Sequence, residues 1–183
     1  TQNGSLLIAC PEDQHILQRF QNHIPKQIQS HPTPQAIEPA LHNKFQDALY
    51  LKPEAHLNPK KTLQSLCAYL ESQPNITLKT DHPIPRSSDH PITINCTGMS
   101  ANDPQIRGVK GETLIVHNPE FTLSRPIRLM HPRYPLYIIP REDHTFMIGA
   151  TNIESAQNIS VSLRSAMELM SSLHSLSPTF AEA

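Results

Sequence analysis

Two β-prone runs separated by a short charged turn constrain the fold of this chain most strongly. Residues 134–140 and 144–150 are rich in Tyr, Ile, Phe and Met, and Arg141–Asp143 stands between them. Such a pair of runs, joined by a polar turn, is typical of an antiparallel hairpin. Because side chains alternate across a strand, Tyr134 and Tyr137 are expected on opposite faces of that hairpin.

Short strands and amphipathic helices are expected along the rest of the chain. Further runs typical of strands occupy residues 5–10, 47–51, 76–79, 92–96 and 113–116. Apolar residues at helical spacing occupy residues 11–28, 59–70 and 163–173. This order of elements predicts an α+β fold, with a mixed, largely antiparallel sheet and flanking helices.

The expected helices have definable faces and ends. The first is expected to bury every fourth residue, namely Ile16, Phe20, Ile24 and Ile28. The second is expected to start with Asn58 as its cap and Pro59 as its first residue. Its expected apolar face consists of Leu63, Leu66, Cys67 and Leu70. The polar, proline-containing residues 81–90 are expected to form a surface loop.

Composition excludes several classes of partner and site. The 15 basic and 16 acidic residues are well mixed, so no electrostatic surface for nucleic acid or an anionic membrane is expected. No apolar run reaches the roughly 20 residues of a membrane span, and the first residues do not resemble a secretory signal. A cytoplasmic location is therefore expected.

Metal-binding and hydrolytic chemistry also find no support in the sequence. The three cysteines lack C-x-x-C spacing, and their neighbours in the sequence are apolar. Buried, reduced thiols are therefore expected at Cys10, Cys67 and Cys96. The 11 histidines contain no pair with the spacing of metal ligands, and no G-x-S-x-G nucleophile motif occurs. We therefore assign no metal ligand and no catalytic residue.

Two glycine-containing segments could approach a ligand. Residues 108–112 (GVKGE) match neither a Walker sequence nor G-x-G-x-x-G and precede a strand, which favours a simple turn. Thr97 and Gly98 follow a predicted strand, where backbone could approach a ligand. An ordinary exit from strand to turn is the favoured interpretation of the second segment on its residues alone.

The order and spacing of these motifs resemble a family of flavin enzymes. The matching segments are Phe45–Leu51, Ile94–Ala101, Gly108–Glu112, Tyr137–Arg141, Phe146–Thr151 and Ile153–Ser155. Together they resemble the D-amino-acid oxidase and glycine oxidase family of FAD-dependent amine oxidases. The resemblance is strongest to the glycine oxidase-like oxidoreductases of thiamine biosynthesis, and it covers most of the chain.

The resemblance implies a domain division and site residues. Residues 1–35 and 109–183 would belong to the substrate-binding domain and residues 36–108 to the FAD domain, packed as one compact fragment. Tyr137 would contact the substrate, with a half-buried cross-strand tyrosine as the alternative. Thr97 and Gly98 would lie near the dinucleotide, and Lys110 could face the cofactor.

The resemblance also implies a reaction and a limit. The parent protein would oxidise a small amino acid or amine, transferring a hydride to FAD, and dioxygen would reoxidise the flavin to give hydrogen peroxide. The family's dinucleotide-binding glycines and substrate-binding arginine lie outside these residues. The chain is therefore expected to be an internal fragment that retains no FAD and is inactive, with exposed apolar faces that could form a homo-oligomer. The alternative function is a non-catalytic binding or interaction module of the same fold.

Overall fold

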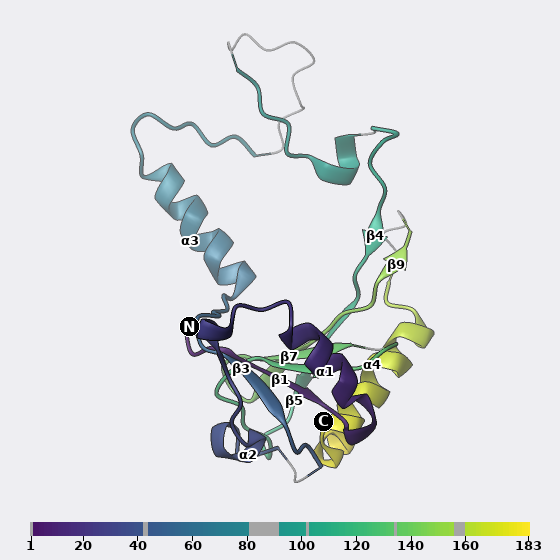
Figure 1. The fold of residues 1–183 in the computed structure, drawn as a ribbon. Coiled ribbons are helices and arrows are strands. Elements are labelled where there is room, and N and C mark those ends of the chain that lie inside the picture. Colours follow the sequence, from purple (N-terminus) through teal and green to yellow (C-terminus); the bar gives the residue numbers. More distant parts are fainter. Residues whose placement is uncertain (1, 42–43, 81–91, 102, 134, 156–159) are drawn as a thin grey trace. The chain divides into compact units, whose positions relative to one another are not determined.

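The computed structural model describes residues 2–41, 44–80, 92–101, 103–133, 135–155 and 160–183 (Figure 1). These residues form two compact units. The first unit combines Thr1–His56 with Val109–Ala183, and the second comprises Leu57–Gly108. Tyr134 and the expected loop at residues 81–90 lie outside the described residues.

Most of the secondary structure belongs to the first unit. Its strands are β1 (Ser5–Ala9), β2 (Gln29–Ser30), β3 (Ala48–Leu51), β4 (Val109–Lys110), β5 (Thr113–His117), β6 (Ile127–Met130), β7 (Leu136–Pro140), β8 (Thr145–Gly149) and β9 (Ile153–Glu154). Its α-helices are α1 (Gln14–Gln21), α2 (Pro34–Ile37) and α4 (Leu163–Leu176), and its 3-10 turns are η1 (Pro11–Asp13), η2 (Lys26–Ile28) and η4 (Pro178–Glu182). The second unit contains α3 (Pro59–Glu71) and η3 (Gly98–Ala101).

Seven strands form one mixed sheet in the order β2-β3-β1-β6-β7-β8-β5. Only the pairing of β1 with β6 is parallel, and the other neighbours are antiparallel. The expected hairpin is confirmed as β7 and β8, and its turn places Asp143 and His144 at positive φ. The expected α+β class is likewise confirmed, with a short β4–β9 pair beside the main sheet.

Helix α4 covers one face of the sheet and forms the main core. Its buried residues Leu169, Leu173 and Leu176 repeat every three or four positions, which sets one apolar stripe against the strands. Ile138 of β7 and Phe146 of β8 belong to this core. Ser162 caps the helix by accepting a hydrogen bond from the backbone N–H of Ser165.

Helix α1 covers the other face over β1 and β3. Leu17 is its buried residue, and it packs with Leu7, Leu49 and Leu51. Phe20 and Ile24 of the expected stripe are partly buried against the same cluster. The helix itself is shorter than expected, because it ends at Gln21, with Asn22 as its C-cap. The approach to Pro25, which has no N–H to donate, ends the helical run before Ile24.

A buried ion pair fixes the chain before β6. Glu38 is buried, and its Oε1 lies 2.6 Å from Nε of Arg125. Its other carboxylate oxygen accepts the backbone N–H of Ser124 at 3.0 Å. The backbone N–H of Leu6 in turn donates to the carbonyl of Pro126 at 3.0 Å, so this pair lies where β1 and β6 begin.

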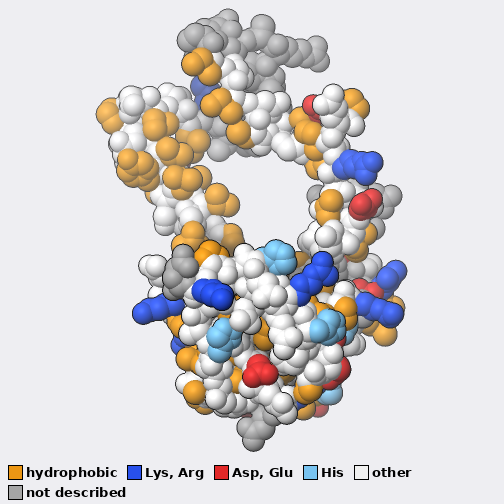
Figure 2. All heavy atoms as spheres, in the orientation of Figure 1, with side chains coloured by type: hydrophobic (Ala, Val, Ile, Leu, Met, Phe, Trp, Pro, Cys, Tyr) orange, Lys and Arg blue, Asp and Glu red, His pale blue; other side chains and the backbone are white. Residues whose placement is uncertain are grey.

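Helix α3 in the second unit has the expected cap and an unexpected surface. The Asn58 side chain accepts the backbone N–H of Lys61, as predicted. Leu63 and Tyr69 are each 61% exposed, however, and Cys67 is exposed instead of buried. Hydrophobic side chains gather on the surface of this helix (Figure 2). No residue of α3 is buried within the described part of the chain. Self-association through such apolar surfaces stays a prediction.

Two predicted strands are absent from the described residues of the second unit. Residues 76–79 and 92–96 have no strand assignment, Cys96 is exposed, and Ile94 is 81% exposed. A strand needs hydrogen bonds to a neighbouring strand, and no such neighbour occurs among the described residues of this unit. Composition alone was therefore a misleading guide here.

The compact units and the expected domains share the boundary at residues 108 and 109 and differ at the other one, which lies at residue 56 instead of 35. Residues 36–56 pack within the first unit, where Leu41 and Phe45 are buried in the main core. The correspondence of residues 36–108 to an FAD domain stays a prediction. Among the described residues, no helix has the length and apolar character required to traverse a lipid bilayer.

Candidate functional site

One row of paired residues crosses the sheet from β1 to its β5 edge. The register pairs Leu7 with Arg128, Arg128 with Tyr137, Tyr137 with Gly149, and Gly149 with Thr113. Directly paired residues project from the same face, so all five share the face that α1 covers at β1. Tyr137 is partly exposed.

The same face continues beyond α1 with apolar side chains. Ile139, Met147 and Ile115 form the next paired row across β7, β8 and β5. Ile115 is 66% exposed, and the other two are partly exposed. We define the Tyr137 face as the surface formed by Arg128, Tyr137, Ile139, Met147 and Ile115.

Gly149 allows Tyr137 to lie against the sheet. A Cβ atom built on Gly149 would stand 2.2 Å from both Cζ and the phenol oxygen of Tyr137. The ring therefore occupies the space that any side chain at position 149 would fill. The sequence motif that contains Gly149 thus serves to seat the tyrosine.

Arg128 is a site residue that sequence reasoning missed. It is directly opposite Tyr137, and its Nη2 lies 2.9 Å from a carboxylate oxygen of Glu54. Both side chains of this ion pair are partly exposed. The run 127–130 carried too weak a strand signal for a register to be assigned, so the neighbour of Tyr137 required the structure.

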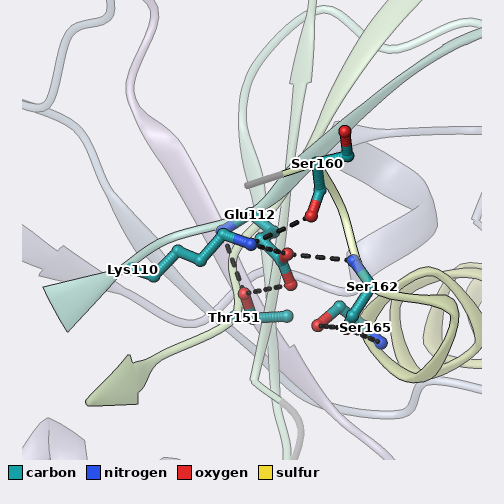
Figure 3. A network of polar contacts seen from close by, with 6 residues as sticks. All are labelled: Lys110, Glu112, Thr151, Ser160, Ser162 and Ser165. Carbon is teal, nitrogen blue, oxygen red and sulfur yellow. Dashed lines mark hydrogen bonds and ion pairs between the residues drawn. The ribbon is translucent and has the colours of Figure 1, made fainter. Parts of the chain in front are cut away.

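A buried carboxylate gathers three distant segments at the start of β5 (Figure 3). The Glu112 side chain is 2% exposed, and its Oε1 lies 2.7 Å from Nζ of Lys110. The same oxygen accepts the backbone N–H of Ser162 at 3.0 Å. The Thr151 hydroxyl donates to Oε2 at 3.4 Å. We call these residues, together with Ser165, the Glu112 clasp.

The backbone extends the same connection. The N–H of Glu112 donates to Oγ1 of Thr151 at 2.9 Å, and the N–H of Thr151 donates to the carbonyl of Glu112 at 3.2 Å. Lys110 also donates to the carbonyl of Ser160 at 3.0 Å. The Lys110 ammonium is therefore engaged within the clasp. A direct contact between Lys110 and a cofactor would require these bonds to open.

The clasp strongly favours the ionised form of Glu112. Hydrogen bonds from Lys110 and Ser165 lower the pKa of this carboxyl to about 2, and burial opposes them only in part. The backbone N–H of Ser162, the N-cap of α4, and the positive charge of Lys110 act in the same direction. Glu112 is thus an anion at the N-terminus of α4.

A cavity of about 680 Å³ lies beside the clasp and α4. Its wall includes Glu112, Thr151, Arg133, Leu136 and Leu169. Leu136 and Leu169 belong to the core on the α4 side of the sheet, whereas Tyr137 projects from the opposite face. The cavity and the Tyr137 face are therefore separate surfaces of the first unit.

Thr97 and Gly98 belong to the second unit. The N–H and the hydroxyl of Thr97 both donate to Oδ1 of Asn95, at 3.0 and 2.7 Å, which forms a tight local turn. Gly98 follows with φ of +54°, and open space surrounds the position that a Cβ would take. Gly98 is exposed.

The structure therefore groups the predicted site residues only in part. Tyr137 and Lys110 both belong to the first unit, on the Tyr137 face and in the clasp respectively. Thr97 and Gly98 are neighbours in the second unit. Within the described residues, no group of three His, Cys, Asp or Glu side chains could hold a metal ion.

We predict that the clasp makes stability depend on pH below neutrality. Because folding lowers the Glu112 pKa from 4.5 to about 2, its contribution is complete above pH 4.5 and is lost as pH falls towards 2. Urea unfolding followed by circular dichroism should show wild type more stable than Glu112→Gln at pH 7. The difference should shrink between pH 4.5 and 2, whereas a difference that is independent of pH would contradict this assignment.

Comparison with known proteins identifies the family. The sequence model of the FAD dependent oxidoreductase family (DAO) matches residues 1–183. The Rhizobium etli protein named for thiamine biosynthesis, oxidoreductase ThiO, is 43% identical over 152 residues, covering 81% of this chain and 46% of that protein. D-amino-acid oxidase of Dictyostelium discoideum is 29% identical over 98 residues, covering 51% of this chain and 27% of that protein.

Solved structures agree with this fold over the whole chain. Glycine oxidase from Bacillus cereus has a TM-score of 0.72 at 19% identity, covering 100% of this chain and 58% of that one. L-proline dehydrogenase from P. horikoshii has a TM-score of 0.78 at 13% identity, covering 100% and 57%. The resemblance drawn from the motifs is confirmed. The chain, which spans about half the length of these proteins, belongs to the FAD dependent oxidoreductase (DAO) family.

Proposed function

We propose that this chain is part of a flavin-dependent oxidase of small amino acids or amines, in which the Tyr137 face borders the reaction site. The observation that carries the proposal is the position of Tyr137 on a partly exposed apolar face, held against Gly149 by close packing. Family membership supports FAD as the cofactor of the parent protein. The name of the Rhizobium etli relative supports a role in thiamine biosynthesis.

The residues of the Tyr137 face fit one side of a flat ring system. Ile115, Ile139 and Met147 offer an apolar surface, and the Tyr137 phenol adds one polar group beside it. Aromatic cofactors are commonly bound by such surfaces with few polar groups. We propose that this face holds the isoalloxazine ring and the substrate, while Thr97 and Gly98 lie near the dinucleotide.

The roles of the chain's own side chains follow from their chemistry. The Tyr137 phenol can donate a hydrogen bond to a substrate carboxylate while its ring excludes water from the same site. Arg128 adds a positive charge beside it, although Glu54 neutralises much of that charge. When bound, FAD supplies the hydride acceptor and its reoxidation by dioxygen gives hydrogen peroxide. These two side chains orient the substrate and determine the polarity of the site that binds it.

We propose further that the chain by itself retains no FAD and is inactive. A pyrophosphate is commonly bound where a glycine-rich turn leads into a helix. Within the described residues, none of the α-helices begins after such a turn. The purified chain mixed with FAD and passed through gel filtration should therefore show no flavin absorbance. Chain unfolded in urea and then treated identically is the control for adventitious association. A stoichiometric yellow complex of folded chain would contradict this part of the proposal.

In the parent protein, we predict that Tyr137→Phe weakens substrate binding and leaves flavin binding intact. A hydrogen bond to a charged group contributes about 1.5–3 kcal/mol, so KM should rise at least about tenfold. Steady-state oxygen consumption with a panel of small amino acids, together with the flavin spectrum, would measure both effects.

The matched control for that experiment is Tyr50→Phe. The Tyr50 phenol donates to the carbonyl of Asn3, and its register with Leu6 places it on the α4 side of the sheet. That variant should leave KM unchanged. Equal effects of the two substitutions, or an unchanged KM in Tyr137→Phe, would contradict the role proposed for Tyr137.

A further inference from the structure

The Glu112 clasp and the seat of Tyr137 belong to adjoining parts of one strand pair. Glu112 directly precedes Thr113, which is paired with Gly149, and Gly149 is paired with Tyr137. On the other strand, Thr151 is two residues beyond Gly149 and exchanges backbone and side-chain hydrogen bonds with Glu112. The clasp therefore closes the end of the β5–β8 ladder at the row that carries the Tyr137 ring.

The position of β5 makes this closure important. β5 is the edge strand of the sheet, so it has a hydrogen-bonded neighbour only on the β8 side among the described residues. The clasp adds anchors that the ladder alone lacks, because Ser162 and Ser165 belong to the start of α4, about 50 residues away in the chain. Edge strands open more readily than central ones when their ends are released.

We infer that Glu112 is a positioning residue for Tyr137. Its carboxylate ties the first residues of β5 and the end of β8 to α4, and thereby fixes Gly149 beneath the tyrosine ring. Charge-assisted hydrogen bonds hold more strongly than neutral ones, which explains why a buried glutamate with a lysine partner occupies this point. The consequence for substrate binding rests on the function proposed for Tyr137. The coupling between Glu112 and the ring does not depend on it.

The test compares two buried glutamates by NMR in the full 183-residue chain. Glu112→Gln removes the charge of the clasp, and Glu38→Gln removes the charge of the other buried ion pair, at the starts of β1 and β6. Amide hydrogen exchange reports local opening, and selective tyrosine labelling gives ring signals for the four tyrosines. The Tyr137 ring signal is assigned by its loss in Tyr137→Phe.

The expected result is specific to position. Glu112→Gln should raise exchange at residues 113–115 and 149–151 by about tenfold, as expected when charge-assisted hydrogen bonds are lost, and should shift the Tyr137 ring signal. Glu38→Gln should spare both readouts and affect residues 5–8 instead. An unchanged ring signal in Glu112→Gln, or equal effects of both substitutions, would overturn the inference.

A second pair of variants keeps the test decisive if Glu112→Gln does not fold. Thr151→Val removes the hydroxyl that links the segment after β8 to Glu112, whereas Thr151→Ser retains it. The valine variant should shift the Tyr137 ring signal, and the serine variant should restore it. Identical spectra for the two variants would also overturn the inference. Because no flavin or substrate is present, failure here would leave the proposed function standing, and failure of the Tyr137→Phe kinetics would leave this coupling standing.

Discussion

The register of the central strands determines which side chains each face of the sheet presents. It sets Arg128, Tyr137 and Gly149 side by side in one row and leaves the alternate residues, such as Ile138, in the core under α4. A slip of one residue would exchange the two sets, because side chains alternate between faces. The close fit of the Tyr137 ring over Gly149 and the burial of Ile138 both oppose such a slip. Packing on one face thus determines what the other face presents.

The two faces of the sheet differ in the side chains that they present. The α4 side contains the main core, the buried Glu112 and a cavity, whereas the Tyr137 face offers apolar side chains and a phenol. At the β5 edge, the hydrogen bonds of Glu112 join Thr151, which follows β8, to the start of α4.

Sequence patterns predicted the elements that depend on local signals. The β7–β8 hairpin, the Asn58 cap and α4 follow from turn residues, capping chemistry and apolar spacing in single segments. The expected strand at residues 92–96 failed because a strand requires a partner, which no composition can supply. The same reason explains the exposed α3, whose apolar stripe has no described partner to cover it.

The site was predictable only as far as motifs reach. The tyrosine at position 137 could be named from its motif, whereas Arg128 and the Glu112 clasp depend on pairings between distant segments. Lys110 was expected near the cofactor, yet its ammonium is bound to Glu112, a partner visible only once the fold is known. The sequence also could not show which face of the sheet is covered by helix α4. Alternation along a strand shows only which residues share a face.

Thiol labelling of single cysteines can establish which face of β7 carries Tyr137. In a background with Cys10, Cys67 and Cys96 replaced by serine, Tyr137→Cys and Ile138→Cys are each treated with a thiol reagent in the folded chain. The register described here predicts rapid labelling at position 137 and protection at position 138 until the chain unfolds. Protection at 137 with rapid labelling at 138 would contradict this register, because Tyr137 would then belong to the core instead of the Tyr137 face.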